Sequence, residues 1–205
     1  METTLCEYQF MKSIINDYDK YNHFLKSSKG CNHDRSKERE LYERKTDDKL
    51  NAIKMFCEDG NKLFNENKIE EAINEYKSAI IYIDYTFPDI NSPENIEYNN
   101  LIIRTHSNLS ACFLKLNEYN MTILHCKHVL KYDQSNLKAY YRLVKAYIGL
   151  YKYDEAVSII DSIISNDKYN ESEMSIFHNL KKSVQELEKK YHKSNSKIYK
   201  KLFKN

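Results

Sequence analysis

The fold is decided by residues 137–170, LKAYYRLVKAYIGLYKYDEAVSIIDSIISNDKYN, because the stretch directly before them has the same pattern. That stretch, residues 103–136, reads IRTHSNLSACFLKLNEYNMTILHCKHVLKYDQSN, and a further copy begins at Ile53. Each copy contains a position suited to close helix packing. An aromatic or large residue lies four places before this position, and an apolar residue lies three places after it. A small residue comes twelve places after it. The aligned positions are Phe56, Gly60, Leu63 and Ala72; His106, Ser110, Phe113 and Thr122; and Tyr140, Val144, Tyr147 and Ala156.

The spacing of these copies predicts a solenoid of helical hairpins. The starts at Ile103 and Leu137 lie 34 residues apart, which is the period of the tetratricopeptide repeat (TPR), a helix–turn–helix unit. The first two starts are 50 residues apart, and the additional residues surround Pro88 and Pro93. They predict a longer loop with extended flanking helices, and the second hairpin is expected to begin at about Pro93. We therefore predict an all-α, three-repeat TPR solenoid, with repeats at about 53–86, 103–136 and 137–170 and an inserted loop near 87–102.

Helical segments are expected on both sides of the repeats. Residues 1–45 combine an amphipathic stripe beginning at Leu5 with a polar stretch, which predicts a helical extension and a linker or weak helix. The first repeat helix is expected to begin at Thr46, whose hydroxyl would cap it. Residues 170–205 are predicted to form a basic capping helix over the last hairpin, started by a capping box of Asn170 and Glu173. Its apolar stripe is Phe177, Leu180, Val184, Leu187 and Tyr191.

Composition excludes several classes of function. The net charge of +2 over 205 residues gives no case for nucleic-acid binding. The five cysteines have no paired spacing, which favours a reduced, cytoplasmic protein. No apolar run is long enough to span a membrane. No phosphate-binding loop, catalytic set or cofactor motif is present, and His125, Cys126 and His128 lack a second ligand pair, so we expect neither cofactor nor metal.

The first helices of the hairpins are expected to line a groove that binds an anion. Residues three or four apart on these helices share the groove face. Arg can hold a carboxylate through two hydrogen bonds, Lys acts as a point charge, and Asn both donates and accepts. The candidate set combines two side-chain amides with cations and contains no carboxylate, which suits an anion. The alternative is that these are ordinary solvated residues of a chain rich in Lys and Asn. The candidate residues are Cys57, Asn61, Asn108, Lys115, Lys138, Arg142 and Lys145.

Residues 46–61, TDDKLNAIKMFCEDGN, resemble the first helix of the TPR domain in large immunophilins, the FKBP-type co-chaperones of heat shock protein 90. The resemblance continues through NKIEEAINEYKSAIIYI, SNLSACFLKLNEY and NLKAYYRLVKAY to the basic last helix. It implies a carboxylate clamp for the acidic C-terminal Glu-Glu-Val-Asp peptide of heat shock protein 90 or 70. The matching clamp positions are Asn61, Asn108, Lys138 and Arg142, with Lys115 as a supporting lysine. Cys57 stands where the family has Lys, so the clamp is expected to be partial.

These observations predict a non-enzymatic, co-chaperone-like adaptor. We expect no isomerase domain, because the 45 residues before Thr46 show no β pattern. One alternative is a structural scaffold whose groove holds another protein or its own tail. Another is a module that binds calmodulin or an acidic membrane surface through its Lys-rich C-terminal helix.

Overall fold

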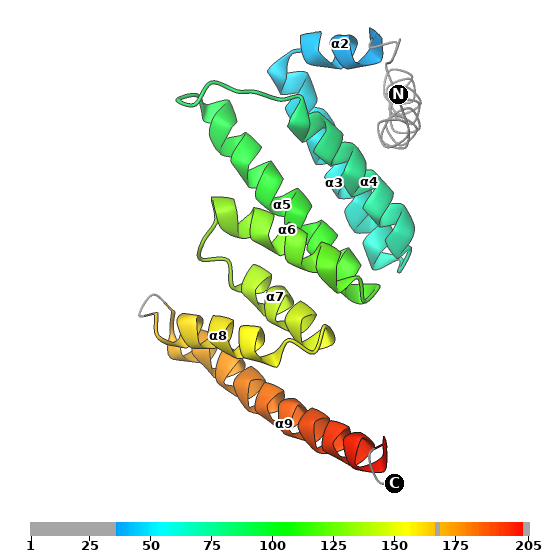
Figure 1. The fold of residues 1–205 in the computed structure, drawn as a ribbon. Coiled ribbons are helices and arrows are strands. Elements are labelled where there is room, and N and C mark those ends of the chain that lie inside the picture. Colours follow the sequence, from blue (N-terminus) through cyan, green and yellow to red (C-terminus); the bar gives the residue numbers. More distant parts are fainter. Residues whose placement is uncertain (1–35, 167–168, 203–205) are drawn as a thin grey trace, which may run out of the picture. The chain divides into compact units, whose positions relative to one another are not determined.

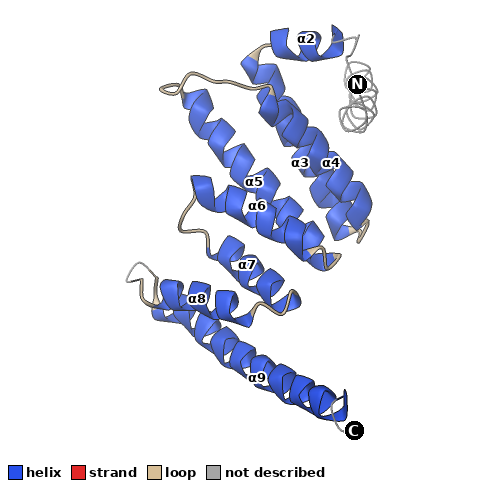
Figure 2. Ribbon diagram, in the orientation of Figure 1, coloured by secondary structure: helices blue, strands red, loops and turns tan. Residues whose placement is uncertain are grey.

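The computed structural model describes residues 36–166 and 169–202, and all regular structure within them is helical (Figures 1 and 2). The all-α prediction is therefore confirmed for these residues, whereas the amphipathic stripe beginning at Leu5 lies outside them. The chain divides into two compact units, one ending at Thr105 and the other beginning at His106. The helices are α2 (Ser36–Glu43), α3 (Thr46–Asn65), α4 (Ile69–Asp84), α5 (Pro93–Lys115), α6 (Tyr119–Tyr132), α7 (Leu137–Gly149), α8 (Tyr153–Ile164) and α9 (Glu171–Leu202).

The turns that follow α3, α5 and α7 share one backbone feature. Each contains a residue in the left-handed region: Asn67 at φ 65°, Asn117 at φ 60° and Tyr151 at φ 59°. These residues are 50 and 34 places apart, the same spacing as the predicted repeats. Asparagine tolerates this conformation, whereas tyrosine adopts it only when its surroundings hold it there. Tyr151 stacks on Tyr191 of α9, with ring centroids 5.4 Å apart.

Small residues allow the helices of each hairpin to pack closely. In the first unit, a β-carbon at Gly60 would lie 2.5 Å from the ring of Tyr76, so any other residue would displace that tyrosine. Ala72, on the facing helix α4, is completely buried. The repeat alignment predicted both positions, and it also predicted their counterparts in the second unit. Those counterparts are equally buried: Ser110, Thr122, Val144 and Ala156.

A buried lysine joins three helices of the first unit. Lys49 is only 5% exposed, and its Nζ donates hydrogen bonds to the carbonyl oxygens of Tyr42 (2.8 Å) and Tyr85 (2.9 Å). These carbonyls lie at the C-terminal ends of α2 and α4, where a cation is favourable. Burial lowers the pKa of Lys49.

The expected hydroxyl cap at Thr46 is wrong: Lys45 occupies the N-cap position and Thr46 is the first helical residue.

We expect Lys49→Met to destabilise the first unit, because two helix-terminal carbonyls lose a charged donor. A hydrogen bond to a charged group contributes roughly 1.5–3 kcal/mol, so urea unfolding should show a loss of roughly 3 kcal/mol. The control is Lys62→Met on the same helix, since Lys62 is exposed and pairs with Asp59, whose side chain is 43% exposed. That control should change the free energy of unfolding by less than about 0.5 kcal/mol. Equal effects of the two substitutions would contradict this role of Lys49.

The segment inserted between the first two repeats is mostly helix. The loop ends before Pro93, the first residue of α5. The inserted segment near 87–102 is therefore loop only up to residue 92, and an extended flanking helix begins at Pro93, as expected for the second hairpin. Proline suits the first helical position because its φ is already helical and no partner is needed for an N–H. The added turns of α5 are fixed within the first unit. Tyr98 donates to the carbonyl of Ile83 at 3.0 Å, and Glu97 forms an ion pair with Lys54.

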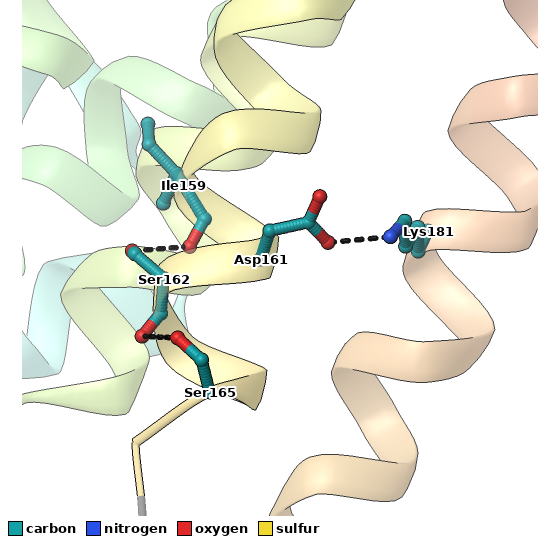
Figure 3. Close-up of polar contacts among 5 residues, drawn as sticks. All are labelled: Ile159, Asp161, Ser162, Ser165 and Lys181. Atoms are coloured by element: carbon teal, nitrogen blue, oxygen red, sulfur yellow. Dashed lines mark hydrogen bonds and ion pairs between the residues drawn. The ribbon is translucent and has the colours of Figure 1, made fainter.

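The second unit has its own apolar core, to which α9 contributes. Helix α7 packs on α6 and α8, and α8 packs on α9. An ion pair of 2.5 Å between Asp161 of α8 and Lys181 of α9 lies at the margin of this core (Figure 3). The buried side chains are Val144, Tyr153, Ala156, Ile160, Ile163, Phe177, Leu180 and Val184.

Helix α9 begins with the predicted capping box. The Glu173 amide donates to Asn170 Oδ1 at 2.9 Å, and the Asn170 amide donates to Glu173 Oε2 at 3.1 Å. The predicted stripe is buried at its first three positions, up to Val184. Leu187 and Tyr191 remain 41% and 37% exposed, so the stripe is less buried toward its C-terminal end than predicted.

Candidate functional site

A pocket of about 620 Å³ lies within the second unit. It is formed by the C-terminal end of α5, the first turns of α7 and the first turns of α9. On each helix the lining residues recur at three- or four-residue spacing, so they share one face. They are Ala111, Leu114 and Lys115 of α5; Leu137, Lys138, Tyr141 and Arg142 of α7; and Glu173, Ile176 and Phe177 of α9.

Three of the predicted anion-binding residues meet in this pocket: Lys115, Lys138 and Arg142. The two lysines are exposed, whereas Arg142 is half-buried. Arg142 Nη1 lies 2.8 Å from Ser107 Oγ and 3.2 Å from the Ser107 carbonyl oxygen, so the guanidinium is held in place before a ligand arrives. Burial lowers the pKa of Arg142, although an arginine stays charged at neutral pH.

Two further candidates of the second unit lie outside the pocket lining. Asn108 is half-buried on α5, nearly two turns before Lys115. Lys145 lies one turn after Arg142 but turns over the ring of Tyr141, with Nζ 5.6 Å from the ring centroid. Neither residue appears among those that line the pocket.

The remaining two candidates, Asn61 and Cys57, belong to the first unit. Asn61 Oδ1 accepts a hydrogen bond from the Tyr76 hydroxyl at 2.8 Å. Cys57 is completely buried, and its Sγ lies 3.1 Å from Thr105 Oγ1. Burial raises the pKa of the Cys57 thiol, which keeps it neutral. The prediction that Cys57 lines an open groove is therefore wrong.

Sequence reasoning missed the contribution of α9 to the pocket. The candidate set contains no carboxylate, but Glu173 is one of the residues that line the pocket. Ile176 and Phe177 follow it on the same face. The capping box placed Glu173 in the first turn of α9, and the spacing of Ile176 and Phe177 could have grouped all three. Nothing local, however, indicated that this face would line the same pocket as residues of α5 and α7.

Three histidines cluster between α5 and α6 in the second unit. His106 Nδ1 lies 2.8 Å from His125 Nδ1, and the rings of His106 and His128 stack in parallel at 4.4 Å. Burial, followed by the charges of the other two histidines, lowers the pKa of His106 to about 3. Among the residues that the structure describes, no group of three or more His, Cys, Asp or Glu side chains is arranged to hold a metal ion.

None of the described helices combines the length and the apolar composition needed to cross a membrane. This finding covers residues 36–166 and 169–202 only.

Comparison with known sequences identifies FKBP-type relatives. No family model matches the chain. The peptidyl-prolyl cis-trans isomerase FKBP42 of Arabidopsis thaliana is 33% identical over 150 residues, which are 71% of this chain and 39% of that protein. FK506-binding protein 5 of Rhizopus delemar is 34% identical over 102 residues, 50% of this chain and 26% of that protein. The chain thus spans well under half the length of these curated relatives.

Comparison with solved structures identifies TPR-containing chains of similar fold. The C-terminal TPR-containing domain of an FK506-binding protein of Plasmodium falciparum is 27% identical with a TM-score of 0.58, covering 71% of this chain and 99% of that domain. The Hsp90 co-chaperone Cns1 of Saccharomyces cerevisiae is 24% identical with a TM-score of 0.58, covering 78% of this chain and 47% of that one, and supports the fold alone. The helical hairpins of this chain are therefore of the tetratricopeptide type, and the chain is similar to the TPR-containing part of FKBP-type proteins.

Proposed function

We propose that this chain is a non-enzymatic adaptor that binds the acidic C-terminal peptide of a heat shock chaperone of the 90 or 70 class. The observation that carries the proposal is the pocket of the second unit, which combines three cationic side chains with an apolar lining. Similarity to TPR domains of FKBP-type proteins supports a role in protein interaction. We propose no isomerase activity for this chain.

The chemistry of the pocket suits a peptide that ends in a carboxylate. Arg142, already oriented by Ser107, can hold the terminal carboxylate through two hydrogen bonds, and the exposed Lys138 and Lys115 add positive charge. Leu114, Leu137 and Tyr141 offer an apolar surface for a side chain such as the valine of a Glu-Glu-Val-Asp sequence. Asn108 and Asn61 remain proposed contributors by resemblance. With Cys57 neutral and buried, we expect weaker binding than in a clamp that has a lysine there.

The direct test is titration calorimetry of the full chain with an acetylated Glu-Glu-Val-Asp peptide and with its C-terminally amidated copy. We expect the free acid to bind about tenfold more tightly, since a hydrogen bond to a charged group contributes roughly 1.5–3 kcal/mol. Lys138→Gln should lower the affinity for the free-acid peptide severalfold. Lys127→Gln, which removes an exposed lysine of α6 outside the pocket, is the matched control. Equal affinities for the acid and the amide would contradict the proposal.

No observation favours the alternative of a calmodulin-binding last helix over this function. The apolar side chains of α9 up to Val184 are buried in the core of the second unit. A helix that binds in a partner's groove uses such a face as its anchor.

A further inference from the structure

The pocket contains one carboxylate among its three cations. Glu173 lines the pocket from the first turn of α9, together with Ile176 and Phe177. Lys115 and Lys138 line it from α5 and α7. A carboxylate in the proposed anion site weakens the binding of any ligand that places a negative charge close to it, because like charges repel across a short distance.

Local contacts hold this carboxylate in place without a ligand. Glu173 Oε2 accepts a hydrogen bond from the Asn170 amide at 3.1 Å, and the Glu173 amide donates to Asn170 Oδ1 at 2.9 Å. One turn later, Phe177 is 2% exposed within the core of the second unit. The backbone that carries Glu173 is therefore anchored from both sides. Among the described residues, none forms an ion pair with Glu173 that would neutralise its charge.

We propose that Glu173 is a specificity-determining residue of this pocket. Its carboxylate disfavours an acidic ligand residue beside the first turn of α9 and favours a neutral residue or a hydrogen-bond donor there. The pocket would then accept a terminal carboxylate on the side of Arg142, Lys138 and Lys115, and would discriminate among acidic peptides by where their remaining charges lie. This inference rests on the proposed function, because it assigns the selectivity of the same site.

The capping box suggests a conservative variant. Glutamine also serves at the third position of a capping box, so Glu173→Gln should remove the charge and preserve the start of α9. The matched control is Glu171→Gln, which removes an exposed carboxylate from the same helical turn but outside the pocket lining. Equal thermal midpoints of both variants and the parent chain would establish that folding is unchanged.

The experiment measures dissociation constants of the parent chain and both variants for three free-acid peptides. These are acetylated Glu-Glu-Val-Asp and two copies in which one glutamate is replaced by glutamine. We expect Glu173→Gln to bind the fully acidic peptide about two- to fivefold more tightly than the parent. The reason is that the interaction between two partly exposed charges is worth roughly 0.5–1 kcal/mol. The gain should disappear for one of the two glutamine copies, which would identify the ligand residue beside α9, and it should shrink with added salt.

The outcomes separate this inference from the proposed function. If the parent prefers the free acid to the amide but Glu173→Gln and Glu171→Gln bind all three peptides alike, the role of Glu173 is overturned and the peptide-binding function stands. If no form of the chain distinguishes the free acid from the amide, both are overturned.

Discussion

A chain that lacks residues 170–205 is expected to lose roughly 5–9 kcal/mol of stability in its second unit. The deletion removes three buried side chains, Phe177, Leu180 and Val184, and uncovers the surface of α8 on which they pack. Burying a large apolar side chain contributes roughly 1.5–3 kcal/mol. A loss of this size is comparable with the whole stability of a small domain, so this unit should unfold or become poorly packed at room temperature.

Urea unfolding followed by circular dichroism would measure this effect. The control is a chain truncated after Lys193, which keeps the buried residues and also Tyr191, whose ring lies 5.8 Å from that of Tyr153. We expect that control to unfold at nearly the same urea concentration as the full chain. If deletion of residues 170–205 also left the midpoint unchanged, α9 would be a free tail, and a calmodulin-binding role would become the better hypothesis.

Acid is expected to destabilise the second unit through His106. The side chain is 8% exposed, and its pKa is lowered to about 3, first by burial and then by the charges of His125 and His128. A histidine in the unfolded chain has a pKa of about 6.5. The folded pKa is the lower one, so this contribution is fully present above pH 6.5. It is lost as the pH falls from 6.5 toward 3, because the unfolded chain takes up the proton more readily.

The variant His106→Phe separates this effect from ordinary acid denaturation. Each pKa unit corresponds to about 1.4 kcal/mol, so between pH 6.5 and 4.5 His106 should account for roughly 2–3 kcal/mol of lost stability. Phenylalanine keeps an aromatic ring at a position where the other repeats have Phe56 and Tyr140, and it cannot be protonated. Urea unfolding at pH 7, 5.5 and 4.5 should therefore show a shallower decline for this variant. His178→Phe, at an exposed position of α9, should decline like the parent; equal declines of all three chains would contradict the role of His106.

The amino-acid sequence by itself determined the helices and the tight contacts inside each hairpin. The 34-residue period and the small residues at Gly60, Ala72 and Ala156 express local requirements, because a helix can approach its neighbour closely only where the side chain is small. The capping box of Asn170 and Glu173 is equally local, since both partners lie within one turn. Such features depend on residues close in sequence, and pattern reasoning recovers them.

The tertiary structure decided which of these residues meet, and in what surroundings. The pairing of Arg142 with Ser107, and the place of Glu173 in the same pocket, join residues more than 30 positions apart. The burial of Cys57 and the pairing of His106 with His125 depend likewise on which helix face lies against another. Periodicity identifies the apolar face of a helix but not the neighbour that covers it, because that choice is made by the packing of the whole core. For this reason the sequence indicated the cations of the candidate site, and only the packed helices supplied its carboxylate and the fixed orientation of its arginine.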